Sequence, residues 1–164
     1  GSRSHSGPSL SPRSLLNLER GTNLVLPSPN GATLSLLGTS AHIFAGCLRN
    51  AQAVSSRVQQ AGSPVAVIAA AELWPDGSPR FALEDLIGAG AIIHYLNGSK
   101  SPEALLAESA FLNVTHSITS SLRECVSGVE LIEKGFPGDV DLASQLNVSQ
   151  CVPELRDGCY SWEE

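Results

Sequence analysis

Three loops of this 164-residue sequence carry side chains whose chemistry suits a phosphate group and a divalent cation. The loops are residues 28–33 (SPNGAT), 46–51 (GCLRNA) and 72–85 (ELWPDGSPRFALED). The polar groups that could serve such a site include two hydroxyls, two amides and three carboxylates, from Ser28, Thr33, Asn30, Asn50, Glu72, Glu84 and Asp85. Backbone N–H groups at helix starts bind phosphate, and hard cations take oxygen ligands. The set therefore indicates a site for a phosphorylated ligand and a metal ion.

Some of these residues also have a purely structural interpretation. Asn30-Gly31 is a common turn sequence. Glu84 and Asp85 occupy the first turn of a predicted helix, where acids stabilise the helix by about 0.3–1 kcal/mol. Glu72 is harder to explain in this way, because it follows an entirely apolar strand and its carboxylate emerges at the end of that strand.

A cysteine-nucleophile phosphatase is not indicated by the sequence. Such enzymes carry Cys-x5-Arg, but the sixth residue after Cys47 is Ala53, and the sixth after Cys151 is Asp157. The four cysteines show no CxxC spacing and no histidine partners at zinc-finger distance. We expect reduced thiols in a cytoplasmic protein.

Predicted strands precede the three loops. We expect strands at residues 23–26, 42–45 and 65–71, with helices at 32–37 and 48–60 between them. The apolar runs are continuous rather than alternating, which is typical of strands covered on both faces. Strands alternating with helices favour a parallel sheet with right-handed crossovers. Ligands of such sheets bind beyond the carboxyl ends of the strands, where these loops lie.

The chain after Trp74 is predicted to be mostly helical. Ser101 is expected to be an N-cap, Ser127–Glu130 a capping box and Asp139 a helix cap. Gly88 and Gly90 permit close backbone packing. The expected helices span residues 83–96, 101–125, 127–135 and 139–147, and a turn is expected at 157–158.

Composition restricts the partners and the domain organisation. A net charge of −6 gives no electrostatic reason for binding nucleic acid or an anionic membrane. The apolar runs are too short to cross a bilayer, and no signal peptide is visible. The sequence does not begin with Met, and residues 1–22 are expected to form a loop or extended segment ahead of one domain at 23–164.

Read in order, the loops resemble the 2-phosphosulfolactate phosphatase family. The stretches SPNGAT, AGCLRNAQAV and FALEDLIGAG match family stretches that resemble T-T-x-N-G-T, G-S-x-x-N-A and F-x-L-E-D-x-x-x-A-G. The resemblance covers nearly all of residues 10–155. It implies a three-layer α/β/α fold with a mostly parallel sheet, a bound Mg²⁺, and hydrolysis of 2-phosphosulfolactate to sulfolactate and phosphate on the route to coenzyme M.

The resemblance implies that Asn30, Gly31, Thr33, Asn50, Glu84 and Asp85 belong to the site, and the loop positions add Ser28 and Glu72. Phosphate or substrate binding is predicted for Ser28, Asn30, Gly31, Thr33 and Asn50. Catalytic roles are predicted for Glu72, Glu84 and Asp85, of which Glu84 and Asp85 are candidate metal ligands.

Three departures from the family pattern stand out. The family's N-terminal third is absent, so the chain corresponds to the C-terminal two-thirds and is expected to need that segment for activity or to self-associate. Pro27-Ser28 replaces a Thr-Thr pair. Leu73 stands where relatives often carry Arg, which leaves the substrate open. The alternative is a protein that binds a small phosphorylated metabolite without hydrolysing it.

Overall fold

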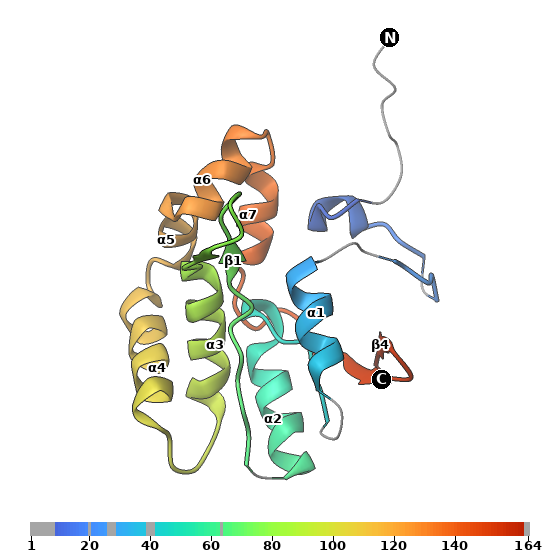
Figure 1. The fold of residues 1–164 in the computed structure, drawn as a ribbon, viewed down its shortest axis with the longest axis vertical. Coiled ribbons are helices and arrows are strands. Elements are labelled where there is room, and N and C mark those ends of the chain that lie inside the picture. The colour runs from blue at the N-terminus through green and yellow to red at the C-terminus, as the bar shows by residue number, and fades with distance from the viewer. Residues whose placement is uncertain (1–8, 20, 26–28, 39–41, 63, 163–164) are drawn as a thin grey trace.

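The computed structural model describes residues 9–19, 21–25, 29–38, 42–62 and 64–162. These residues form a mixed α/β protein in which helices predominate (Figure 1). The helices are η1 Pro12–Leu15, α1 Pro29–Leu37, η2 Leu48–Asn50, α2 Ala51–Ala61, α3 Leu83–Tyr95, α4 Pro102–Val114, α5 Ile118–Glu124, α6 Val126–Glu133 and α7 Pro137–Ala143. The strands are β1 Glu72–Leu73, β2 Pro79–Arg80, β3 Glu154–Arg156 and β4 Cys159–Ser161. No helix within the described ranges is long and apolar enough to cross a membrane.

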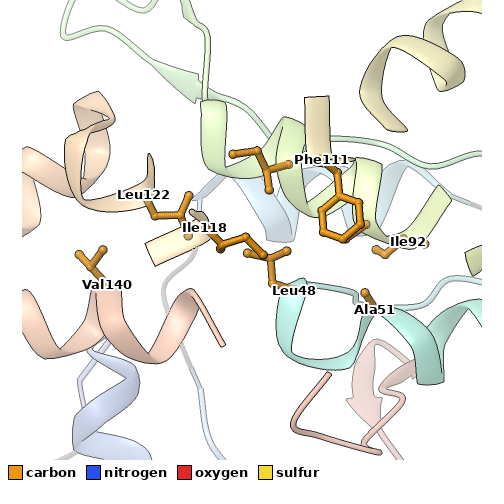
Figure 2. Close-up of a cluster of buried hydrophobic side chains, with 9 residues drawn as sticks. Leu48, Ala51, Ile92, Phe111, Ile118, Leu122 and Val140 are labelled. Atoms are coloured by element: carbon orange, nitrogen blue, oxygen red, sulfur yellow. The ribbon is translucent and has the colours of Figure 1, made fainter. Parts of the chain in front are cut away.

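The hydrophobic core lies between the helices. Figure 2 shows side chains from η2, α2, α3, α4, α5 and α7 meeting in one cluster. Phe111 of α4 and Ile87 of α3 are its largest fully buried members. The cluster is completed by Leu48, Ala51, Ala91, Ile92, Ile118, Leu122 and Val140. This packing fixes α3 between α2 and α4, and α3 carries the predicted acidic residues Glu84 and Asp85 at its start.

The described β-structure consists of two antiparallel hairpins, β1–β2 and β3–β4. The β3–β4 turn contains Asp157 and Gly158, which have φ values of 50° and 78°. Positive φ at both central residues is the geometry of a type I′ turn, so the predicted turn is confirmed. The described residues contain no parallel sheet, and the three-layer arrangement expected from the resemblance is not shown by them.

None of the three predicted strands is formed among the described residues, although residues 42–45 are hydrogen-bonded to residues 153–155. Residues 23–25 form no strand, and Leu26 lies outside the described residues. Residues 42–45 contribute one isolated bridge, between Phe44 and Glu154. Residues 65–71 are without any ladder partner among the described segments. A strand is stabilised by pairing. In the described part of the chain only residues 42–45 have a paired neighbour, because the Ala45 N–H donates to Pro153 at 2.9 Å and the Leu155 N–H donates to Ile43 at 2.8 Å.

Most helix predictions are confirmed, with shifts at their ends. The helix predicted at 83–96 is α3, and the one predicted at 48–60 corresponds to η2 and α2. Ser101 caps α4 as predicted, because its hydroxyl accepts a hydrogen bond from the Ala104 N–H at 3.3 Å. The helix predicted at 32–37 begins earlier, at Pro29, since proline is favoured at the first helical position.

Three helix predictions were wrong in detail. The expected helix 101–125 is divided into α4 and α5 by a turn in which the Ser117 N–H binds the Val114 carbonyl. The helix α6 is capped by the Cys125 sulfur, which accepts the Gly128 N–H at 3.4 Å, and not by Ser127. Asp139 lies within the first turn of α7, and the N-cap residue is Phe136.

The start of the chain explains why Asp139 does not act as a cap. Its Oδ1 accepts the hydroxyl of Ser11 at 2.8 Å and the N–H of Arg13 at 3.0 Å. Both residues lie in the segment 1–22, which was expected to be loop and contains η1. Asp139 is 128 positions from Ser11 and 126 positions from Arg13, so capping rules that consider only neighbouring residues do not detect these contacts.

Candidate functional site

Two of the predicted carboxylates lie at the N-terminus of α3. Glu84 and Asp85 are in its first turn, and both are half-buried. The N-cap residue, Ala82, provides no side-chain cap for the helix. The first N–H groups of a helix carry partial positive charge, which favours acids at this end. The helix therefore holds two adjacent carboxylates in a partly desolvated place.

Asp85 is the electrostatic centre of the site. Burial raises the pKa of its carboxyl group above the ordinary value, and the negative charges of Glu84 and Glu72 raise this pKa further. A hydrogen bond from the Ala71 backbone N–H acts in the opposite direction on the pKa. Glu72 of β1 is therefore close enough to influence Asp85, and the three predicted catalytic residues form one acidic cluster.

Asn30 joins this cluster from α1. Its Nδ2 donates to Oε2 of Glu72 at 3.1 Å and to the carbonyl oxygen of Ala71 at 3.2 Å. The start of α1 is thereby attached to the start of β1, across 42 positions of sequence. The structure thus brings together Asn30, Glu72, Glu84 and Asp85, as expected for loops that share one functional site.

Ala71 connects the two halves of the site. Its N–H binds Asp85 and its C=O accepts from Asn30. It has a φ of 61°, a conformation that is uncommon for residues other than glycine. Backbone strain of this kind often accompanies functional sites. Sequence analysis treated Ala71 only as the end of an apolar strand, and no local pattern marks its conformation.

Glu84 contacts a second residue that sequence analysis did not assign to the site. The Cys125 Sγ lies 3.6 Å from Oε2 of Glu84, and Cys125 is buried. Burial raises the pKa of this thiol, and the negative charge of Glu84 adds to the effect. Cys125 is consequently a protonated donor to Glu84 rather than a thiolate nucleophile.

Arg80 holds the hairpin that carries Glu72. Its side chain is 9% exposed, and its terminal nitrogens donate to Glu130 at 2.7 Å and to Ser127 at 3.3 Å. The guanidinium lies 5.4 Å from the centre of the Trp74 ring. Because Arg80 is paired with Glu72 across β1–β2, these contacts fix the hairpin against α6. Ser127 and Glu130, which were predicted to form a capping box, instead accept hydrogen bonds from Arg80.

Asn50, another predicted ligand, binds backbone carbonyls rather than the acidic cluster. Asn50 is buried, and its amide donates to the carbonyls of Ala45 at 3.3 Å and Cys151 at 2.9 Å. Both of its N–H donors are therefore engaged in fixing the neighbouring segments. Thr33 is exposed on α1, Gly31 is half-buried in the first turn of the same helix, and Ser28 lies outside the described residues.

The donor set of the cluster suits a divalent cation. In the described ranges, no group of three or more His, Cys, Asp or Glu residues is arranged to hold a metal ion by itself. Mg²⁺, however, commonly binds through one or two carboxylates and completes its shell with water and substrate phosphate. No lysine, arginine or histidine among the described residues forms an ion pair with Glu72, Glu84 or Asp85. The site therefore carries negative charge without a cationic side chain paired to it among the described residues.

Comparison with known proteins agrees with the resemblance. Residues 8–158 match the family model for 2-phosphosulpholactate phosphatase. The chain is 31% identical over 141 residues to the 2-phosphosulfolactate phosphatase of Methanothermobacter thermautotrophicus, covering 85% of this chain and 58% of that protein. It is 31% identical over 147 residues to a probable 2-phosphosulfolactate phosphatase of Carboxydothermus hydrogenoformans, with the same two coverages.

A third relative, a probable 2-phosphosulfolactate phosphatase of Thermosynechococcus vestitus, is 27% identical over 144 residues. The match covers 82% of this chain and 57% of that protein. The chain therefore spans somewhat more than half the length of these curated relatives. Because the family model covers nearly the whole chain, this protein belongs to the 2-phosphosulpholactate phosphatase family.

Proposed function

We propose that this chain contributes the metal- and phosphate-binding part of a Mg²⁺-dependent phosphomonoester hydrolase whose substrate is 2-phosphosulfolactate or a similar small phosphorylated hydroxy acid. The observation that carries the proposal is the convergence of Glu72, Glu84 and Asp85 with Asn30 in a chain of this family. Three neighbouring carboxylates without a described cationic partner are costly in a partly buried place, which is the arrangement expected of a functional site.

The two carboxylates of α3 are assigned to the metal. In the protein without a bound cation, burial and the nearby charge of Glu84 raise the pKa of Asp85. A cation beside Asp85 and Glu84 would favour the ionised form of both carboxyl groups. When bound there, Mg²⁺ would supply charge neutralisation for the phosphoryl oxygens. Cys125 holds Glu84 in position by its hydrogen bond.

Substrate orientation and proton transfer are assigned to the other two residues. Backbone N–H groups at the start of α1 would bind phosphoryl oxygens, while the Asn30 amide, whose two N–H groups donate to Glu72 and Ala71, would orient Glu72. Glu72, held at Oε2 by Asn30, would accept the proton of the attacking water. The water oxygen then forms a bond to phosphorus, the ester P–O bond breaks, and the departing alkoxide takes up a proton from solvent water.

Phosphate release from 2-phosphosulfolactate tests the proposal, measured with added Mg²⁺ and with EDTA. The Methanothermobacter relative serves as the positive control, and a chimera joining its unmatched polypeptide to this chain serves as the longer form. We expect turnover that needs Mg²⁺, reduced at least 100-fold by Asp85→Asn or Glu84→Gln.

Asp76→Asn is the matched control, since Asp76 lies in the same loop, is exposed and bonds only to Ser78 among the described residues. It should leave turnover unchanged. Full activity in both Asp85→Asn and Glu84→Gln would show that the site is wrongly placed. Binding of the phosphorylated compound without hydrolysis in the chimera would show that the protein is a binder and not an enzyme.

A further inference from the structure

Two segments that are distant in the sequence lie alongside each other in antiparallel directions. Phe44 forms an isolated antiparallel bridge with Glu154, and a backbone hydrogen bond of 2.9 Å joins the next pair of residues along the two segments. Each step forward in the first segment therefore corresponds to one step backward in the second. The same register, continued for two more residues, places Cys47 opposite Cys151.

The side-chain amide of Asn50 connects the backbones of the two cysteines. Its Oδ1 accepts the Cys47 N–H at 2.8 Å, and its Nδ2 donates to the Cys151 carbonyl oxygen at 2.9 Å. In a regular antiparallel ladder with this register, the same N–H and carbonyl would bind each other directly. One planar amide therefore lies between the two backbones, and the pairing of the segments extends as far as the cysteines.

The two thiols are placed to react with each other. Side chains of residues directly opposite each other in an antiparallel pair lie on the same face. Cys47 is exposed, Cys151 is half-buried, and neither takes part in a disulfide in this structure. Burial raises the pKa of the Cys151 thiol, and negative charge on Cys47 raises this pKa further, which agrees with a short distance between the two sulfur atoms.

We propose that Cys47 and Cys151 are a disulfide-forming pair, oxidised by a small disulfide such as oxidised glutathione. Cys47, after losing its proton to solvent, attacks one sulfur of the oxidant, so that a mixed disulfide forms and one thiolate of the oxidant leaves. Cys151 then loses its proton and attacks the Cys47 sulfur, which expels the second thiolate. Two protein thiols are thereby oxidised to one disulfide, and the oxidant is reduced to two thiolates, which take up the two protons.

The proposal goes beyond the phosphatase assignment and does not depend on it. Cys47 and Asn50 belong to the same loop, residues 46–51, so the bond would fix this loop against the chain at Cys151. The bond would also close a loop of about 100 residues, and a cross-link of this length restricts the unfolded chain strongly. Oxidation should therefore raise the melting temperature by about 5 °C or more.

Peptide mapping identifies the pair directly, because trypsin, which cleaves after Lys and Arg, places each cysteine in a different peptide. The four peptides are 21–49, 124–134, 135–156 and 157–164. The folded chain is equilibrated in glutathione buffers of increasing oxidising strength, alkylated, digested and analysed by mass spectrometry. We expect the cross-link between peptides 21–49 and 135–156 to exceed every other cross-link by at least about 10-fold, because the fold gives this pair a high effective concentration.

Unfolding supplies the control for the role of the fold. In concentrated urea the pairing is governed by loop closure, which favours cysteines that are close in the sequence. The nearest pair is Cys151 with Cys159. The cross-link between peptides 135–156 and 157–164 should therefore dominate in urea, whereas the bond between Cys47 and Cys151 should dominate in native buffer.

Serine variants connect the cross-link with the change in stability. Cys47→Ser and Cys151→Ser should each remove both the cross-link and the rise in melting temperature on oxidation. Cys159→Ser is the matched control, since Cys159 is an exposed residue of β4, and it should retain both effects. Because Cys47 is also exposed, Cys47→Ser should leave the melting temperature of the reduced chain unchanged.

Three results would overturn the proposal. The first is complete alkylation of Cys47 and Cys151 even in the most oxidising buffer. The second is cross-linking between two chains, seen as a dimer in the mass of the undigested protein, in place of cross-linking within one chain. The third is the same distribution of cross-links in native buffer and in urea, which would show that the fold does not select the pair.

Discussion

Gly90 gives the sharpest test of the helix packing that supports the site. An alanine Cβ at this position would lie 2.1 Å from the Ala107 carbonyl oxygen and 2.9 Å from Cβ of Phe111. The nearest atoms belong to the backbone of α4, so a change of side-chain rotamer cannot relieve the clash. Phe111 is 1% exposed, so it has no adjacent solvent into which it could move. Overpacking of this kind costs about 3 kcal/mol or more, against a helix-propensity gain of about 1 kcal/mol. Gly90→Ala should therefore reduce the free energy of unfolding by about 2 kcal/mol.

Gly88 provides the matched control in the same helix. An alanine Cβ there would have no atom within 4 Å, so only the propensity gain of about 1 kcal/mol remains. For a domain of this size, thermal unfolding should show Gly90→Ala about 4–8 °C below the parent and Gly88→Ala about 2–4 °C above it. Urea unfolding gives the same comparison as free energies. Equal stability of the two variants would refute the close packing of α3 on α4.

Further predictions concern charge and capping. The raised pKa of Asp85 means that its ionisation opposes folding, an effect that is absent below the unfolded-state pKa of about 3.9 and complete above the folded-state pKa. Asp85→Asn should thus raise the melting temperature at pH 7 while leaving it unchanged at pH 3. Ser101→Ala should lower the free energy of unfolding by about 1 kcal/mol in urea titrations, because the Ala104 N–H loses its cap. Glu108 has a lowered pKa, chiefly through its hydrogen bond from Lys100, so Glu108→Gln should lose under about 1 kcal/mol at pH 7, and this loss should shrink as the pH falls through the folded-state pKa of Glu108.

Local signals predicted the features that depend on local interactions. The apolar periodicity of residues 83–96 predicted α3, Ser101 with Pro102 predicted the start of α4, and Asp157-Gly158 predicted a turn. Each of these depends on residues within about one helical turn or one hairpin. The capping box at Ser127 failed because a buried arginine, 47 positions earlier, takes its hydroxyl. Tertiary competition of this kind leaves no trace in the local sequence.

The same distinction applies to the site. Loops that follow successive strands were expected to meet, and the structure brings Asn30, Glu72 and Asp85 together. The role of an individual side chain within such a loop was less predictable. Asn50 has the same amide chemistry as Asn30, but its donors bind the carbonyls of Ala45 and Cys151, whereas those of Asn30 bind Ala71 and the carboxylate of Glu72. Whether an amide binds a predicted site residue or a structural carbonyl depends on the neighbouring backbone, which the residue type does not specify.

The apolar segment at residues 65–71 shows that a hydrophobic pattern reports the environment a segment requires, even where the described chain does not provide it. The pattern predicted a strand covered on both faces, but Ile68 is 70% exposed and the backbone of residues 65–70 is unpaired. Exposed contiguous apolar surface usually marks an interaction site. Because this segment ends at Ala71, whose N–H and C=O bind Asp85 and Asn30, the segment and the acidic cluster share one residue. We therefore expect ordering of the segment and activity of the site to rise together.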